Sequence, residues 1–121
     1  MSGTANASTQ VARPGNSEPP STGVTVRANT IEGAGGNGID VSTEVPGGAT
    51  VTRNISTGNV GAGILMQNTT SGNAVRRNSA SSNGDVDCRD DSTGAQRVGV
   101  ANIWATSNIG ATSTPAGLCH L

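Results

Sequence analysis

The sequence contains no Phe, no Tyr and no Lys, and only one Trp among its 121 residues. A globular core of this size normally includes several aromatic side chains, because each of them buries a large apolar area. The core must therefore be built from Val, Ile, Ala and a few Leu or Met residues. Such slim side chains suit a fold of stacked thin layers and exclude one with a wide interior.

Long apolar runs and strong charge are also missing. No run approaches the roughly 20 residues of a transmembrane helix, and the first ten residues, MSGTANASTQ, have neither the basic nor the apolar region of a signal peptide. The net charge of −1 gives no electrostatic reason to expect nucleic acid or an anionic membrane as a partner. We therefore expect neither partner.

What the sequence does contain is a repeat with a period of about 24–25 residues, whose copies begin at Val24, Ala49, Asn73 and Val98. Residues 23–121 therefore form the repeat region with its closing segment, and residues 1–22, which are polar and hold three of the five prolines, are expected to be a flexible lead-in or a partial coil. The alignment predicts two apolar columns: Val26, Val51 and Val75, and Ile39, Ile64 and Val86.

The period and the composition of each copy indicate an all-β solenoid. Each copy holds two short β-type runs, such as VTVRA and GIDV, separated by Gly, Asn, Ser and Thr. A leucine-rich repeat of similar period requires many more than three leucines, and GGNGIDV at 35–41 has no neighbouring copy nine residues away, as a calcium-binding β-roll requires. Short strands at a constant period predict a parallel β-helix of about three to four coils.

One polar residue recurs at the same place in the repeat. Because equivalent residues of a β-helix stack about 4.8 Å apart, an Asn at a corner can bond the backbone of its own turn and the amide above or below it. Asn also tolerates the left-handed backbone conformation of sharp corners. We therefore predict a structural ladder of four residues: Asn29, Asn54, Asn78 and Asn102.

These features resemble the right-handed parallel β-helix family, the pectin-lyase-like superfamily, and in particular the β-helix repeats of bacterial secreted proteins. The rhythm N-x-x-x…G-I-x-V carries the resemblance through residues 23–88, DCRDD at 87–91 resembles the segment that precedes the last coil, and NIWATSNIGATSTPAGLC at 102–119 resembles the closing coil. The resemblance implies a right-handed solenoid, an extracellular or cell-surface location, and a chain that corresponds to the C-terminal end of a longer protein.

The resemblance also frames the expected function. It implies a structural and interaction module that presents flat polar faces to a polysaccharide or a partner protein. The alternative is a C-terminal remnant of a secreted polysaccharide lyase or glycoside hydrolase. The glycosidase signatures N-T-D, G-H-G and R-I-K are missing, DD occurs once as Asp90-Asp91, and the only histidine is His120. We therefore predict no catalytic residue.

Four carboxylates form the only dense acidic group: Asp85, Asp87, Asp90 and Asp91. Alternation with apolar neighbours predicts that Asp85 and Asp87 face outward from a strand, with Asp90 and Asp91 in the following loop. Oxygen-rich clusters of this kind suit calcium, the one cofactor that the sequence suggests. The competing interpretation is a solvated acidic face partly neutralised by Arg89.

A second charged set is basic and follows the repeat: Arg27, Arg53, Arg76 and Arg77. Arginines at matching positions of successive coils predict an exposed row on one face. Such a row can bind uronate or sulfate groups, because Arg pairs with oxyanions through two hydrogen bonds at once. The competing interpretation is a solubilising strand face. The row is the best candidate for ligand contact in the sequence.

The C-terminal end of the solenoid contains both cysteines. Cys88 ends one strand and Cys119 follows the closing coil, so we predict a disulfide between them, with two free buried thiols as the alternative. A disulfide implies an oxidising compartment. At the other end, the first coil, 24–41, is expected to present an open strand edge, through which the chain could associate end to end with a second copy.

Overall fold

The computed structural model describes residues 3–5, 9–11, 24–41 and 49–121. Of the predicted lead-in, 1–22, only the backbone of two short strands falls within this part, so the prediction of a lead-in lies largely outside the described residues.

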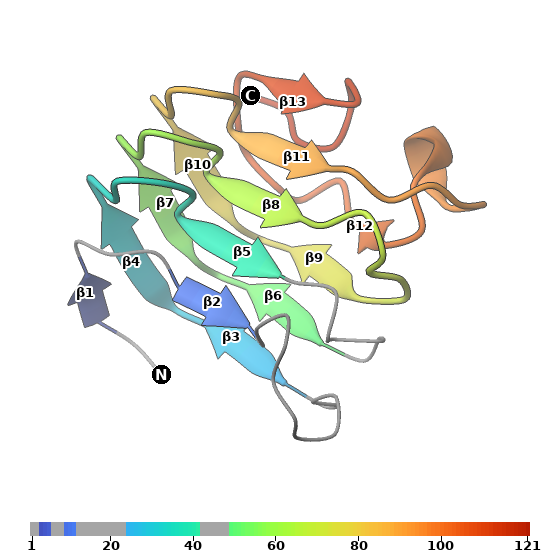
Figure 1. The fold of residues 1–121 in the computed structure, drawn as a ribbon, viewed down its shortest axis with the longest axis horizontal. Coiled ribbons are helices and arrows are strands. Elements are labelled where there is room, and N and C mark those ends of the chain that lie inside the picture. The colour runs from blue at the N-terminus through green and yellow to red at the C-terminus, as the bar shows by residue number, and fades with distance from the viewer. Residues whose placement is uncertain (1–2, 6–8, 12–23, 42–48) are drawn as a thin grey trace.

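The described strands lie in three parallel sheets that wrap around a common core (Figure 1). Sheet A contains β1 (Gly3–Ala5), β4 (Asn29–Glu32), β7 (Ile55–Thr57) and β10 (Ser79–Ser81). Sheet B contains β2 (Thr9–Val11), β5 (Ile39–Val41), β8 (Ile64–Met66), β11 (Cys88–Asp90) and β13 (Ser113–Thr114). Sheet C contains β3 (Thr25–Arg27), β6 (Thr50–Thr52), β9 (Ala74–Arg76) and β12 (Ile103–Trp104). A 3₁₀ turn, η1 (Arg97–Gly99), lies between β11 and β12.

This arrangement is the predicted all-β parallel β-helix. Within the described residues, β3 to β11 complete three coils, and β12 and β13 belong to an incomplete fourth. The coils have no wide interior, because the residues that face inward are slim and occupy one or two columns per sheet. The side chains of Val26, Val51 and Val75 are buried and paired in register, as predicted.

The second predicted column is confirmed in its first two members and wrong in the third. Ile39 pairs with Ile64, but Cys88 rather than Val86 pairs with Ile64 in the next coil. Asn54 precedes Ile64 by ten residues and Asn78 precedes Cys88 by ten, so the second and third coils have the same length between these positions. Val86 is only half-buried. Its large apolar side chain suggested a place beside Ile64, but the smaller Cys88 occupies that place.

The asparagine ladder is present, with one correction. The side-chain oxygen of Asn54 accepts from the side-chain amide of Asn29 at 3.2 Å, and that of Asn78 accepts from Asn54 at 3.0 Å. The fourth member is Asn108, whose oxygen accepts from Asn78 at 2.9 Å; the prediction of Asn102 was wrong. Residues 91–101 contain an insertion, so the last coil is longer than the period of 24–25 residues.

Asn102 belongs to a second ladder, which the sequence analysis missed. Its side-chain oxygen accepts from the amide of Asn73 at 3.0 Å, at the corner between sheets B and C. A third ladder joins Asn59 to Asn83 at 2.8 Å, at the corner between sheets A and B. Asparagine amides therefore support all three corners of the solenoid.

The C-terminal segment closes the last coil. Cys119 is disulfide-bonded to Cys88 with a Cα–Cα distance of 6.3 Å, as predicted. Leu118 is fully buried, and the amide of His120 donates to the carbonyl of Asn108 at 3.1 Å. β13 pairs with β11 over the same end, so the segment covers edges of both sheet A and sheet B.

The N-terminal edge differs from the expectation of an open first coil. β1 pairs with β4 and β2 pairs with β5, so two of the three strands of that coil are covered. Of the three strands of that coil, only β3 is itself an edge strand, while in the other two sheets the edge passes to β1 and β2. End-to-end association through the edge formed by β1, β2 and β3 is untested.

Candidate functional site

The predicted arginines gather on the outer face of sheet C. Arg27 and Arg76 belong to one outward column, with Thr52 between them in register. Thr52 is nevertheless only 8% exposed, which fits the aliphatic stems of flanking arginines lying over it. Arg53 and Arg77 directly follow β6 and β9 and form a second column at the corner with sheet A.

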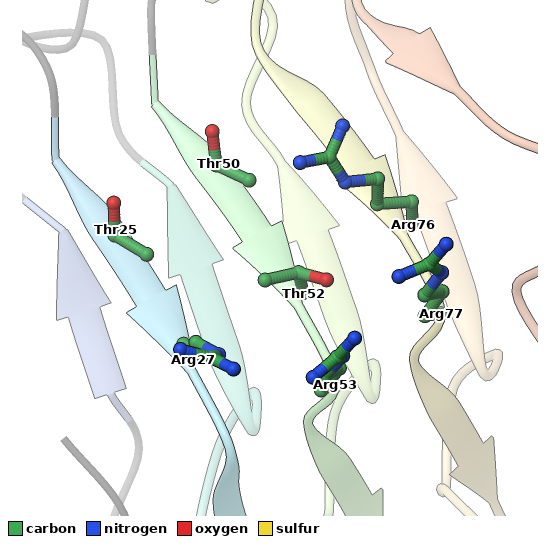
Figure 2. Close-up of a pocket in the computed structure, with 7 residues that line it drawn as sticks. All are labelled: Thr25, Arg27, Thr50, Thr52, Arg53, Arg76 and Arg77. Atoms are coloured by element: carbon green, nitrogen blue, oxygen red, sulfur yellow. The ribbon is translucent and has the colours of Figure 1, made fainter.

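Figure 2 shows these side chains on the same side of the sheet. Together with three threonines they line an open pocket of about 330 Å³, which we call the arginine face: Thr25, Arg27, Thr50, Thr52, Arg53, Arg76 and Arg77. Within the described part of the chain, none of these four arginines forms an ion pair; both ion pairs found there belong to Arg89. With respect to the described residues, the face is therefore a patch of four positive charges without a paired carboxylate.

The corner positions add a backbone observation. Arg53 has φ of 58° and Arg77 has φ of 57°, and Ala28 occupies the same place in the first coil with φ of 57°. This left-handed conformation is uncommon for residues other than Gly, Asn and Asp. The backbone would thus be better served by Asn or Gly at both places, and the local geometry does not explain why Arg is present.

The four carboxylates of the predicted calcium cluster separate into different environments. Asp85 and Asp91 are exposed and flank Arg89, with N–O distances of 2.8 and 2.9 Å. Among the residues that the structure describes, no group of three or more His, Cys, Asp or Glu side chains is placed to hold a metal ion. The donor set therefore does not fit calcium, and the pair around Arg89 matches the solvated acidic face considered as the alternative.

The other two carboxylates are buried, which corrects the expectation that Asp87 faces outward and that Asp90 lies in a loop. Asp90 ends β11 and accepts from the indole of Trp104 at 2.8 Å and the side-chain amide of Asn102 at 3.1 Å. Asp87 accepts from the side-chain amide of Asn83 at 3.0 Å. Both acids satisfy backbone and side-chain donors of the last coil, so their role is structural.

Asp87 continues the third ladder with a carboxylate in place of an amide. Its second oxygen accepts from the backbone amides of Ala111 at 3.0 Å and Thr112 at 3.3 Å. Burial alone would raise the pKa of Asp87, but the hydrogen bonds from Asn83, Ala111 and Thr112 outweigh it and lower the pKa below the ordinary value of 3.8. The ionised form is therefore the one that stabilises the fold.

We expect Asp87→Asn to lower the free energy of unfolding by about 2 kcal/mol at neutral pH, because an amide nitrogen cannot accept from the two backbone donors. A carboxyl whose pKa is lowered by folding stabilises above its unfolded pKa and loses this contribution as the pH falls through the folded value. The difference between the two proteins should therefore be constant near neutral pH and shrink below about pH 4. Urea unfolding at several pH values measures it.

The matched control is Asp85→Asn, which removes a carboxylate that is 41% exposed and paired with Arg89. Its effect should stay within about 0.5 kcal/mol. Equal effects of the two substitutions, or a pH-independent effect at position 87, would contradict the structural role of Asp87.

Sequence reasoning found the arginines of the site but not its threonines. Thr25 and Thr50 pair in one outward column and Thr52 pairs with Arg27 in the other. The signal was present, since alternation in TVR and TVT places these residues on the same side as the arginines. They contribute neutral hydroxyl donors and acceptors between the charges.

Comparison with known proteins identifies one similarity. A family model described as a right handed beta helix region matches residues 4–111. No curated protein and no solved structure matches the chain. No helix in the described residues is long and apolar enough to cross a membrane.

Proposed function

Because this chain belongs to the right-handed β-helix region family, we propose that it is a structural and interaction module that binds an acidic polysaccharide on the arginine face. The observation that carries the proposal is the set of four arginines around one pocket of about 330 Å³, none of which has a carboxylate partner within the described residues. Unpaired guanidinium groups on a regular sheet suit a partner that supplies oxyanions at regular intervals.

The repeat of the fold supports a linear polymer. Arg27 stands on the first coil, Arg53 on the second, and Arg76 and Arg77 on the third, so each coil offers at least one guanidinium. Neighbouring coils are about 4.8 Å apart, close to the length of one sugar unit in an extended chain. The polymer would then lie along the solenoid axis, with sugar hydroxyls beside the threonines.

The other polyanions fit less well. Single-stranded nucleic acid binds through aromatic stacking as well as charge, and the only aromatic residue, Trp104, is 3% exposed and packed in the core. The lining residues of the face include no carboxylate, so the proposal is binding without turnover. The Cys88–Cys119 disulfide supports an oxidising, extracytoplasmic setting, in which polysaccharides are available partners.

The double variant Arg53→Asn/Arg77→Asn should weaken binding to acidic polysaccharides by at least about tenfold, since two charge-assisted contacts are lost. Its melting temperature should be equal to or above that of the parent, because Asn is better suited to the left-handed corner. A glycan array with neutral, carboxylated and sulfated polymers measures binding, and thermal unfolding measures stability.

Arg89→Gln is the control, because it removes one positive charge from sheet B, outside the arginine face. It should leave binding unchanged. The proposed function would be contradicted if the parent protein bound no acidic glycan, or if the double variant bound acidic glycans as well as the parent does.

A further inference from the structure

We propose that the arginine face takes tetrahedral oxyanion esters, that is sulfate or phosphate groups on the polysaccharide, in preference to uronate carboxylates. This inference rests on the proposed function and narrows its ligand. The part of the arginine face that would bind the ester group is formed by Arg53, Arg76 and Arg77.

The three guanidiniums come from two neighbouring coils. Arg76 ends β9, Arg77 follows it at the corner, and Arg53 stands at the same corner one coil earlier. The backbones of Arg53 and Arg77 are therefore about 4.8 Å apart across the coils, and all three arginines line the same pocket (Figure 2). An anion on this part of the face meets more than one guanidinium.

The geometry of the anion then decides the preference. A carboxylate has two oxygens in one plane, and a single guanidinium fork satisfies both of them. A sulfate or phosphate monoester presents three terminal oxygens that point in different directions. It can therefore accept from two or three guanidiniums at once, which is the arrangement that this face offers.

The proximity of like charges on Arg53 and Arg77 also favours an anion with several oxygens. Arg53 and Arg77 are equivalent residues of adjacent coils, and like charges directly opposite each other on neighbouring strands are destabilising. No carboxylate of the described residues relieves them, and both residues occupy the left-handed conformation that Arg does not favour. A single bridging anion with several oxygens would neutralise both charges.

The residue type supports directional recognition. All seven basic residues of the chain are Arg and none is Lys. Arg presents a rigid planar fork of donors, whereas Lys provides a compact point charge. With a net charge of −1 for the whole chain, general attraction to polyanions is weak, so selectivity among anions should be visible in binding.

The test compares polymers that share one backbone: dextran sulfate, carboxymethyl dextran and uncharged dextran of equal length, the first two with equal charge per sugar. At fixed ionic strength, dextran sulfate should bind at least about tenfold more tightly than carboxymethyl dextran, because one additional charge-assisted hydrogen bond changes affinity by about that factor. Dextran should not bind. Arg53→Asn/Arg77→Asn should bring the two charged polymers to the same weak affinity, and Arg89→Gln should preserve the difference.

Competition by small anions distinguishes the two ester types. Sodium sulfate and sodium phosphate, each matched in ionic strength to sodium acetate, should displace dextran sulfate better than acetate does. The better competitor of the two shows whether the face prefers sulfate or phosphate esters. Equal or tighter binding of carboxymethyl dextran overturns this inference and leaves the proposed function standing. Absence of binding to both charged polymers overturns both.

Discussion

Replacing Cys88 and Cys119 together by alanine is expected to lower the free energy of unfolding by about 3–4 kcal/mol on the chain-entropy model. The disulfide closes a segment with a sequence separation of 31. For a chain of this size, the loss corresponds to a fall in melting temperature of roughly 10–20 °C. This is a large part of the stability of a small domain.

The disulfide also holds the closing segment over the last coil. Next to Cys119, the amide of His120 donates to Asn108 and its carbonyl accepts from Gly110. Arg97 links the inserted turn to this segment, because its guanidinium donates to the carbonyl of Gly117 as well as to that of Trp104 in β12. Without the disulfide, the amides of Gly110 and His120 should exchange with solvent first.

Thermal unfolding and amide hydrogen exchange measure this prediction. Reduction of the parent protein should reproduce the double alanine variant, and the reducing agent should not affect the variant itself. The amide of Gln67, which donates to Val41 two coils away from the closing segment, should keep its protection. A double variant within about 1 kcal/mol of the parent would contradict the stabilising role of the closure.

The second large effect is expected for Asn54→Ala, in the middle of the first ladder. The side chain is 1% exposed; it accepts from the backbone amide of Asn29 at 3.0 Å and donates to the carbonyl of Val26 at 2.9 Å and to Asn78 at 3.0 Å. Alanine leaves buried donors and acceptors without partners, each costing about 1–3 kcal/mol. We expect a loss of about 3–4 kcal/mol, measured by urea unfolding.

Asn68→Ala is the matched control. Asn68 is an exposed asparagine in the turn between β8 and β9. Its substitution should change stability by less than about 0.5 kcal/mol. A similar result for both asparagines would show that the ladder does not support the corners.

The fold could be predicted because the repeat period and the strand alternation are local properties of the sequence. Val26, Val51 and Val75 have the same neighbours in every copy, and the ladder from Asn29 through Asn78 follows from the same spacing. Stacking of equivalent residues then leaves one architecture. Only two of the three strands of each coil were expected, however, and Cys88 occupies the place beside Ile64 that was predicted for Val86.

The last coil could not be predicted by extending the period. The insertion between β11 and β12 moves Asn102 into register with Asn73, which leaves Asn108 to complete the first ladder. A loop of different length leaves no periodic signal, and an Asn suits each of the three corners equally well. The burial of Asp87 and Asp90 was missed for a related reason, because the donors that satisfy them come from the closing segment.

The arginine face was predicted as a row, and the structure places its four members around one pocket. The proposed preference among oxyanions depends on how Arg53, Arg76 and Arg77 are placed around this pocket, and this placement depends on the corner geometry and not on spacing alone. The location of the protein and its association with other copies remain predictions.

Amide chemical-shift mapping during a titration with short dextran sulfate chains tests the central proposal most directly. The account predicts saturable shifts confined to sheet C and its corner: Thr25–Arg27, Thr50–Thr52, Ala74–Arg76, Arg53 and Arg77. The shifts should disappear in Arg53→Asn/Arg77→Asn. Shifts centred on Asp40, Leu65 and Arg89 of sheet B, or no saturable shifts at all, would contradict it.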